Sequence, residues 1–214
     1  MLHGTSGGGH VHVEPLLRPI AIAELRPTQM TVGLREVDEK RKRWRKVLAA
    51  DRGDFLGRHM LPCVTGPKGR HYIVDHHHLG RALLQEGVEN VLVTTIVDLS
   101  RLPEDAFWIY LDNRSWTHVY DAKGRRRGFE DMPKSLDAME DDPFRSLAGE
   151  MRRAGGFAKD SAPYSEFLWA DFLRRRMKAK IVREEFARAL REAMALAKTK
   201  DAAFLPGWCG KSGD

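Results

Sequence analysis

The chain has few cysteines and no long apolar run. Only two cysteines, Cys63 and Cys209, occur in 214 residues, and they lie far apart. They belong to no paired metal-ligand spacing, so the sequence indicates neither a disulfide framework nor a zinc site, and we expect both thiols to be reduced. No apolar run approaches membrane-spanning length, and residues 1–10 contain no hydrophobic segment of the signal-peptide kind. We therefore expect a cytoplasmic protein with no membrane partner.

The composition is that of a globular chain with a moderate excess of positive charge. Hydrophobic residues make up 42% of the sequence, enough for a substantial core in one domain with an appendage or in two small domains. The formal net charge is +6, and much of it lies in short basic runs at residues 41–43, 125–127 and 174–176. Such runs can contact phosphates, but each also fits a solvated helix face or a polar turn. Nucleic acid therefore stays open as a partner.

The stretch from residue 70 to residue 84 changes character in the middle. Residues 72–74 favour a strand, whereas the apolar residues between 79 and 83 repeat at helical spacing. Residues 75–78, an aspartate and three histidines, should lie where the strand ends and the helix begins. A helix N-terminus presents unpaired amides and the positive end of the helix dipole, which favour phosphate or another anion. Asp75 is placed to cap this helix.

Upstream of this junction the sequence predicts a strand, a helix and a hairpin. Alternating isoleucines favour a strand at residues 18–25, and a helix is expected to open at Thr28 and run to residue 50. Gly33 interrupts its pattern, so either the helix starts late or another segment approaches closely there; we favour the close approach. Residues 52–54 should break the helix, and a hairpin should follow, with strands at residues 61–64 and 72–74.

Downstream, one strand precedes a region that is mostly helical. The β-branched run at residues 91–98 predicts a strand inside the sheet. Helices are expected at residues 143–151, 165–177 and 182–197. The fold class is thus α+β, with three expected regions: a flexible leader at 1–14, an α+β domain at 15–102, and a helical C-terminal region at 103–214 packed on it.

Five separated blocks carry a resemblance to a known family. They are the segments at residues 28–33, 36–40, 74–78, 142–147 and 166–172. Together they resemble the ParB-like putative nuclease family of the ParB/sulfiredoxin fold, over residues 15–206. The resemblance implies a small mixed sheet with packed helices, followed by a helical C-terminal half. It also implies a nucleotide or phosphate pocket at the start of the helix that follows residue 74, with Glu36 as its acidic residue.

The kinase-like branch of this fold has the motif Asp-Gly-His-His-Arg at the end of the corresponding strand. In this chain His76 replaces the glycine and Leu79 replaces the arginine, so Arg81 would have to supply the missing cation. Sulfiredoxin chemistry needs a cysteine within the motif, and Cys63 lies outside it. The sequence therefore matches neither branch completely.

The site residues are predicted from this position and resemblance. The expected catalytic residues are Glu36, Asp75, His77 and His78. The expected phosphate- or nucleotide-binding residues are Gln29, Gly33, Lys40, His76, Gly80 and Arg81.

Each of these residues also has a purely structural interpretation. Three adjacent histidines cannot all point the same way, so at most two share a ligand and one packs or caps. Glu36 lies one helical turn beyond Gly33 and is expected to approach the histidines, yet it could simply pair with Lys40 in solvent. Asp75 could be only a cap.

Two classes of function follow from the sequence. One is hydrolysis of a phosphodiester or a nucleotide, with a divalent cation and ATP, ADP or CTP as expected ligands. The other is a non-catalytic DNA- or nucleotide-binding module of the partition-protein type, which uses the same helix terminus to hold an anion.

Overall fold

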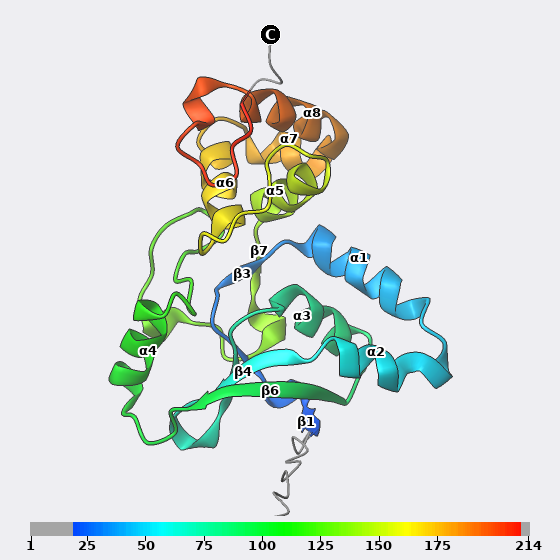
Figure 1. Cartoon of the computed structure of the whole chain (residues 1–214), viewed down its shortest axis with the longest axis vertical. Coiled ribbons are helices and arrows are strands. Elements are labelled where there is room, and N and C mark those ends of the chain that lie inside the picture. The colour runs from blue at the N-terminus through cyan, green and yellow to red at the C-terminus, as the bar shows by residue number, and fades with distance from the viewer. Residues whose placement is uncertain (1–18, 211–214) are drawn as a thin grey trace, which may run out of the picture.

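The computed structural model describes residues 19–210, and the expected leader at 1–14 lies outside them (Figure 1). The fold is mixed α+β, as the sequence predicts. Its strands are β1 (Pro19–Ala21), β2 (Arg26–Pro27), β3 (Thr31–Val32), β4 (Leu61–Thr65), β5 (His71–Ile73), β6 (Asn90–Asp98) and β7 (Glu140–Asp141). Its helices are α1 (Leu34–Arg45), α2 (Arg52–Arg58), α3 (His77–Gln85), α4 (Glu104–Asn113), α5 (Pro143–Arg153), α6 (Ser165–Arg174), α7 (Ala179–Glu184) and α8 (Phe186–Ala197).

The main sheet has five strands in the order β1-β6-β4-β5-β2. The expected hairpin is present, because β4 and β5 pair antiparallel with Val64 opposite Tyr72. The prediction that β6 lies inside the sheet is also confirmed, since β1 and β4 flank it on its two sides. A separate parallel pair, β3 with β7, connects the segment before α1 to the segment before α5.

Helix α3 covers the sheet beside α1 and positions the junction of interest. Leu79 and Leu83 of α3 are buried in one apolar cluster with Leu61 and Ile73 of the hairpin. Leu136 belongs to the same cluster, and a second cluster joins Tyr72 to the buried face of α4. Residues beyond 102 thus pack directly into the core of the sheet.

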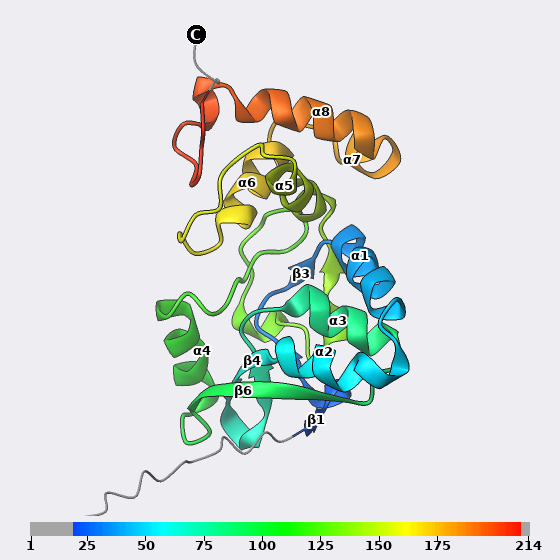
Figure 2. The same cartoon turned by 45° about the vertical axis from the view of Figure 1, so that its right-hand side comes forward.

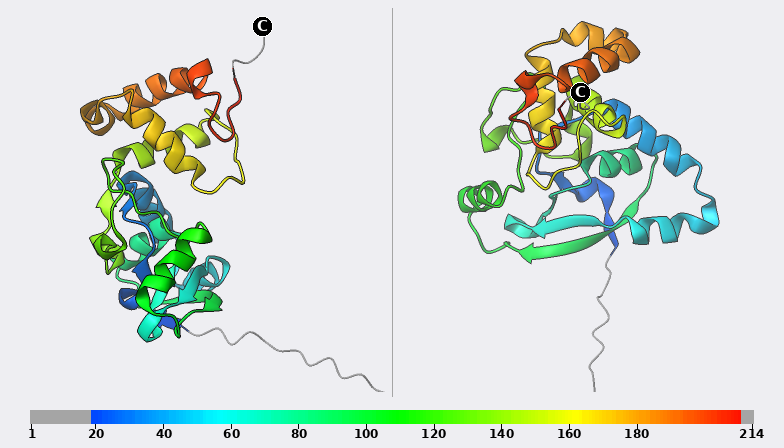
Figure 3. Two further views of the ribbon diagram at one scale, coloured as in Figure 1. Left: turned by 90° about the vertical axis from the view of Figure 1, so that its left-hand side faces the viewer. Right: turned by 45° about the horizontal axis from the view of Figure 1, so that its top comes forward.

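The helices from α5 to α8 have an apolar core of their own. Leu147, Trp169 and Ala193 are fully buried in it. Figures 1 and 2 show these helices gathered at one end of the molecule, with α1 and α3 between them and the sheet. We call the helices α5 to α8 one tier of the molecule, and the sheet with α1 and α3 the other. Figure 3 shows the two tiers from the side and in a view tilted so that the top comes forward. None of the helices between residues 19 and 210 is long and apolar enough to span a membrane.

Four local expectations are wrong. The strand expected at residues 18–25 ends at Ala21, and residues 22–24 form a 3-10 turn. The first helix begins at Leu34, not at Thr28, because the backbone before it pairs with other segments: the Thr28 carbonyl accepts from the His118 amide, and β3 pairs with β7. Residues 52–58 form a helix although Gly53 disfavours one. The expected helix at 182–197 is split into α7 and α8 at Glu185, whose backbone is not helical (φ −128°, ψ 49°).

The junction before α3 is built without a capping side chain. His76 occupies the N-cap position in a left-handed conformation (φ 62°), and the carboxylate of Asp75 accepts from the His76 amide at 2.6 Å. No side chain of residues 19–210 caps the helix. This corrects the expected capping role of Asp75, because a bond to its immediate neighbour satisfies no amide of the first helical turn.

Candidate functional site

A cavity of about 630 Å³ lies against the start of α3. One wall comes from the α+β region of the chain, through Gln29, Asp75, His77 and His78. The opposite wall comes from the helical region and includes the charged residues Arg145, Arg152, Lys159, Asp160 and Glu166. The cavity therefore lies between the two tiers of the fold.

His77 holds the chain before α1 onto the start of α3. Its side chain is buried at 3% exposure, and its Nε2 accepts a hydrogen bond from the Thr28 amide at 3.1 Å. Burial, reinforced by His78, lowers the pKa of His77 to about 3. The ring is therefore neutral at neutral pH, as its role as an acceptor requires.

His78 holds the backbone at Gly33, directly before α1, in the same way. Its Nε2 accepts from the Gly33 amide at 3.0 Å, and burial together with the cations Arg145 and Lys40 lowers its pKa well below the ordinary value. The close approach expected at Gly33 is confirmed, because a Cβ there would lie 2.5 Å from Oγ of Ser146. Gly33 thus lets α5 and His78 meet the same short stretch of backbone.

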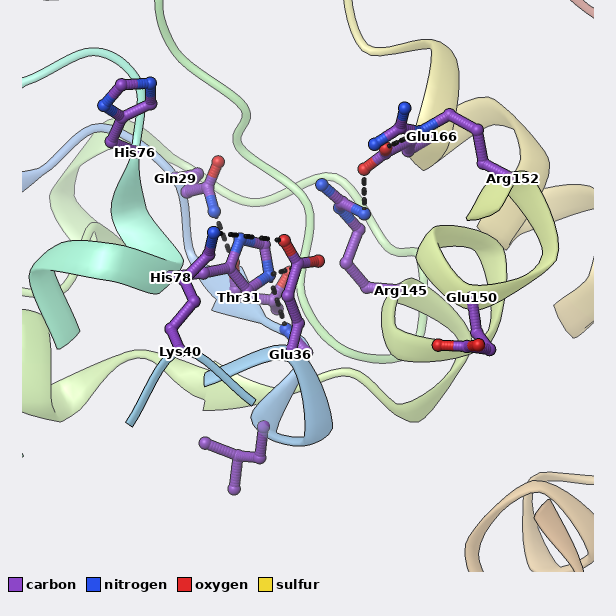
Figure 4. A network of polar contacts seen from close by, with 12 residues as sticks. Gln29, Thr31, Glu36, Lys40, His76, His78, Arg145, Glu150, Arg152 and Glu166 are labelled. Atoms are coloured by element: carbon purple, nitrogen blue, oxygen red, sulfur yellow. Dashed lines mark hydrogen bonds and ion pairs between the residues drawn. The ribbon is translucent and has the colours of Figure 1, made fainter. Parts of the chain in front are cut away.

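Glu36 lies beside His78, as expected. Its Oε2 is 3.7 Å from His78 Nε2 and its Oε1 is 3.9 Å from Nζ of Lys40 (Figure 4). The Glu36 side chain is only 18% exposed, and Oε2 is buried with no hydrogen-bond donor among residues 19–210. Since His78 Nε2 already accepts from Gly33 and carries no proton, it cannot donate to this oxygen. The geometric expectation is confirmed, and the catalytic role of Glu36 stays a prediction.

Two arginines share one carboxylate on the opposite wall. Arg145 forms an ion pair with Glu166, and Arg152 donates to the same carboxylate at 2.5 Å. Burial raises the pKa of Glu166, but the two guanidinium groups outweigh it and lower that pKa below its ordinary value. Arg145 is only 8% exposed, and its Nε is buried with no acceptor in the described chain. Figure 4 shows the Arg145 side chain between Glu36 and Glu166.

Gly80 and Arg81 are used elsewhere, which corrects their expected place in the pocket. A Cβ at Gly80 would lie 3.1 Å from Leu136, so this glycine permits close core packing. Arg81 is buried and donates to the carbonyl groups of Leu136 and Met139. Its guanidinium group therefore fixes the segment before β7 against α3 and is not directed at a ligand.

The other predicted binding residues lie near the cavity in different ways. Gln29 lines it and donates from Nε2 to the Thr31 carbonyl at 2.8 Å. Lys40 pairs with Glu36, and His76 is exposed; none of Glu36, Lys40 and His76 is among the lining residues. Residues 19–210 contain no group of three or more His, Cys, Asp or Glu side chains that could hold a metal ion.

The cationic wall was missed because it lies in the second half of the chain. Arg145, Arg152 and Lys159 are more than 60 residues from His78 in sequence, and nothing in their local pattern distinguishes them from surface cations. The available signal was the resemblance, since two of its blocks contain Arg145 and Glu166.

The fold and the cavity define a class of α+β protein. Its polar cavity lies where strand β5 is followed by helix α3, and the helical C-terminal half forms the opposite wall. The family described as "Putative ParB-like nuclease" matches residues 18–175. The chain belongs to this family. It is similar to a solved structure, protein Atu1540 from Agrobacterium tumefaciens, with 52% identity, a TM-score of 0.85, and coverage of 92% of this chain and 99% of that one. A comparison with curated proteins found no match.

Proposed function

We propose that the cavity at the start of α3 binds the phosphate of a nucleotide or nucleic acid, and that the protein hydrolyses a phosphodiester or phosphoanhydride bond there. The observation that carries the proposal is the buried guanidinium group of Arg145, whose Nε has no acceptor among residues 19–210. A buried charge needs compensation, and the single carboxylate of Glu166 is shared between two arginines. A phosphate group would supply the missing acceptors, since guanidinium binds it through paired hydrogen bonds.

The start of α3 supports the same ligand. The first turn of a helix carries amides without intrahelical partners and the positive end of the dipole. No side chain between residues 19 and 210 caps α3. An anion between this turn and Arg145 would be held from both tiers of the fold.

Glu36 supports hydrolysis over simple binding. Oε2 of Glu36 is buried, has no donor in the described chain and lies beside His78 of the cavity wall. Glu36 does not line the cavity, so the attacking water whose proton it takes would have to reach it past His78, while Asp75, which does line the cavity, would help hold a divalent cation that arrives with ATP, ADP or CTP. The acceptor roles of His77 and His78 make them positioning residues for the loops that form the cavity.

The same histidines favour a second candidate, a DNA- or nucleotide-binding module without turnover. Three of the four predicted catalytic side chains, those of Asp75, His77 and His78, accept from backbone amides, which leaves Glu36 as the one with an unpartnered buried oxygen among residues 19–210. In this alternative the cavity holds phosphate, and Glu36 only pairs with Lys40.

Ligand binding followed by product analysis separates the two candidates. We expect inorganic phosphate, ATP, ADP or CTP to raise the melting temperature, with Mg²⁺ or Mn²⁺ tested alongside each. Arg152→Gln should weaken phosphate affinity about tenfold. Arg153→Gln is the matched control, because Arg153 is the next residue of α5, pairs with Glu150 and does not line the cavity. Release of phosphate from ATP, ADP or CTP, or of oligonucleotides from an added single-stranded DNA, selects hydrolysis, whereas binding without products selects the module. Equal affinity in both variants and the wild type would reject the phosphate site.

A further inference from the structure

A second cavity, of about 600 Å³, adjoins the first. The two cavities share four lining residues, Ser115, Pro163, Tyr164 and Phe167. Their walls are also joined by backbone, since Gln29 of the first cavity forms a parallel bridge with His118 of the second. A ligand of moderate size could occupy both.

Aromatic rings dominate one side of this second cavity. The His118 ring stacks on Phe167 with centroids 3.8 Å apart and an interplanar angle of 25°. Tyr120 and Tyr164 lie against the same imidazole at 4.9 Å and 5.1 Å. Tyr120 lines the cavity and is 39% exposed, so part of its side chain is accessible to a ligand.

The backbone holds these rings in place. Tyr164 adopts a left-handed conformation (φ 59°) at the N-cap of α6, which is uncommon for a bulky residue, and its hydroxyl donates to the Thr117 carbonyl at 2.7 Å. The His118 amide donates to the Thr28 carbonyl at 2.9 Å. The aromatic wall is therefore preorganised by contacts to three different segments.

The charged residues that line this cavity are four aspartates and three arginines: Asp112, Asp121, Asp142, Asp171, Arg126, Arg174 and Arg175. Arg174 pairs with Asp142 at 2.5 Å and with Asp171 at 3.2 Å, and Arg175 pairs with Asp171 at 2.9 Å. His118 is neutral, because burial and then the nearby arginines lower its pKa to about 4. Its Nδ1 is buried and has no partner among residues 19–210. Nε of Arg174 is also buried without an acceptor among residues 19–210, so this wall offers both donors and acceptors to a polar ring.

We propose that the second cavity binds the base of a nucleotide whose phosphate occupies the first. Stacking on aromatic rings beside neutral hydrogen-bonding groups is the chemistry that recognises an unpaired base. The phosphate half of this inference rests on the proposed function. It follows that a polymeric substrate would be single-stranded, or opened, at the bound nucleotide, because a paired base cannot stack on these rings.

The test compares three probes on the full chain: inorganic phosphate, adenosine and adenosine 5′-monophosphate. Tyr120→Leu removes an exposed ring and should weaken the binding of adenosine and of the monophosphate about tenfold, with phosphate affinity unchanged. Tyr120→Phe keeps the ring and should bind all three as the wild type does. Phe204→Leu changes a 77% exposed ring that lines neither cavity and is the matched control.

The outcomes separate this inference from the proposed function. Equal affinity of Tyr120→Leu and the wild type for the monophosphate, with phosphate still bound, would overturn the base site and leave the phosphate site standing. Binding of adenosine that depends on Tyr120, with no gain from the phosphate group, would support the base site and overturn the phosphate site. Absence of binding by all three probes would overturn both.

Discussion

Oε2 of Glu36 lies 3.7 Å from Nε2 of His78, but the two atoms do not share a proton. Nε2 is occupied by the Gly33 amide, and burial keeps the ring neutral through a lowered pKa. The histidine therefore fixes the backbone at the start of α1 and so the position of the carboxylate, while it leaves the carboxylate free to accept. Two side chains that are 42 residues apart thus form one positioned unit.

The first prediction tests whether Glu36 is a base. Glu36→Gln keeps the shape of the side chain and removes its capacity to take a proton at neutral pH. We expect ligand affinity within about twofold of the wild type and a fall in any hydrolysis rate of at least about a hundredfold. Single-turnover product release measures the rate, and titration measures the affinity.

Glu39→Gln is the control for this substitution. Glu39 lies on the same helix, pairs with Lys42 and is 64% exposed, so its replacement should leave both quantities unchanged. A Glu36→Gln protein that turns over at the wild-type rate would remove Glu36 from the chemistry.

The second prediction concerns Glu166, which neutralises the two arginines of the cavity wall. Glu166→Gln should destabilise the free protein, because the buried Arg145 loses its only ion-pair partner between residues 19 and 210. The same change should raise phosphate affinity about threefold to tenfold, since an anion then supplies the lost charge. As the phosphate concentration rises, the melting temperature of Glu166→Gln should therefore approach that of the wild type.

The matched variant is Glu150→Gln on α5, whose carboxylate pairs with Arg153 at the surface. It should change neither the melting temperature nor the phosphate response appreciably, because exposed pairs contribute little. Weaker phosphate binding by Glu166→Gln would show that Glu166 aligns the arginines and does not compete with the ligand.

The strands and the junction could be predicted because their signals are local. The β-branched run at Asn90–Asp98 and the change of period around residue 75 are properties of adjacent residues, and both appear in the structure. The helix at Arg52–Arg58 could not be predicted, since Gly53 and Gly57 disfavour a helix. Phe55 and Leu56 of this helix pack against the apolar cluster of the sheet, a tertiary contact that the local sequence does not encode.

The site was only partly predictable for the same reason. Glu36 and His78 could be predicted because each lies near a recognisable local signal. Glu36 is one helical turn beyond Gly33, and His78 is at the start of a helix. Arg81 and Arg145 are both buried arginines near α3, but one donates to backbone carbonyls and the other faces a cavity. Only the tertiary surroundings of each side chain decide between these two roles.

The third prediction follows from the neutral histidines. The pKa of His77 is lowered to about 3 in the folded protein, against an ordinary value of 6.5, so between these values the unfolded chain binds more protons. Folding stability should then be complete above about pH 6.5 and fall with acidification, by at most about 1.4 kcal/mol per pH unit for each such histidine. Denaturant unfolding from pH 7 to pH 4 measures this slope.

His77→Gln should flatten that slope, because the glutamine carbonyl can accept from the Thr28 amide without titrating. His76→Asn is its control: His76 is exposed, and asparagine tolerates the left-handed conformation. If the free energy of unfolding falls with acidification equally in the wild type and in His77→Gln, the protons are taken up by other groups.

The last prediction concerns the contact that joins the two tiers. A Cβ at Gly33 would lie 2.5 Å from Oγ and 2.8 Å from the backbone nitrogen of Ser146, so Gly33→Ala must push the start of α1 away from α5. We expect a loss of about 1–3 kcal/mol in the free energy of unfolding, as for other overpacked sites. The loss should come with weaker ligand binding, because the Gly33 amide that holds His78 moves as well.

Gly53→Ala is the matched control, since a Cβ there meets nothing within 4 Å and should stabilise α2 slightly. Unfolding curves and phosphate titrations of both variants measure the two effects together. A Gly33→Ala protein as stable as the wild type, with unchanged affinity, would show that α1 and α5 can separate without disturbing the cavity.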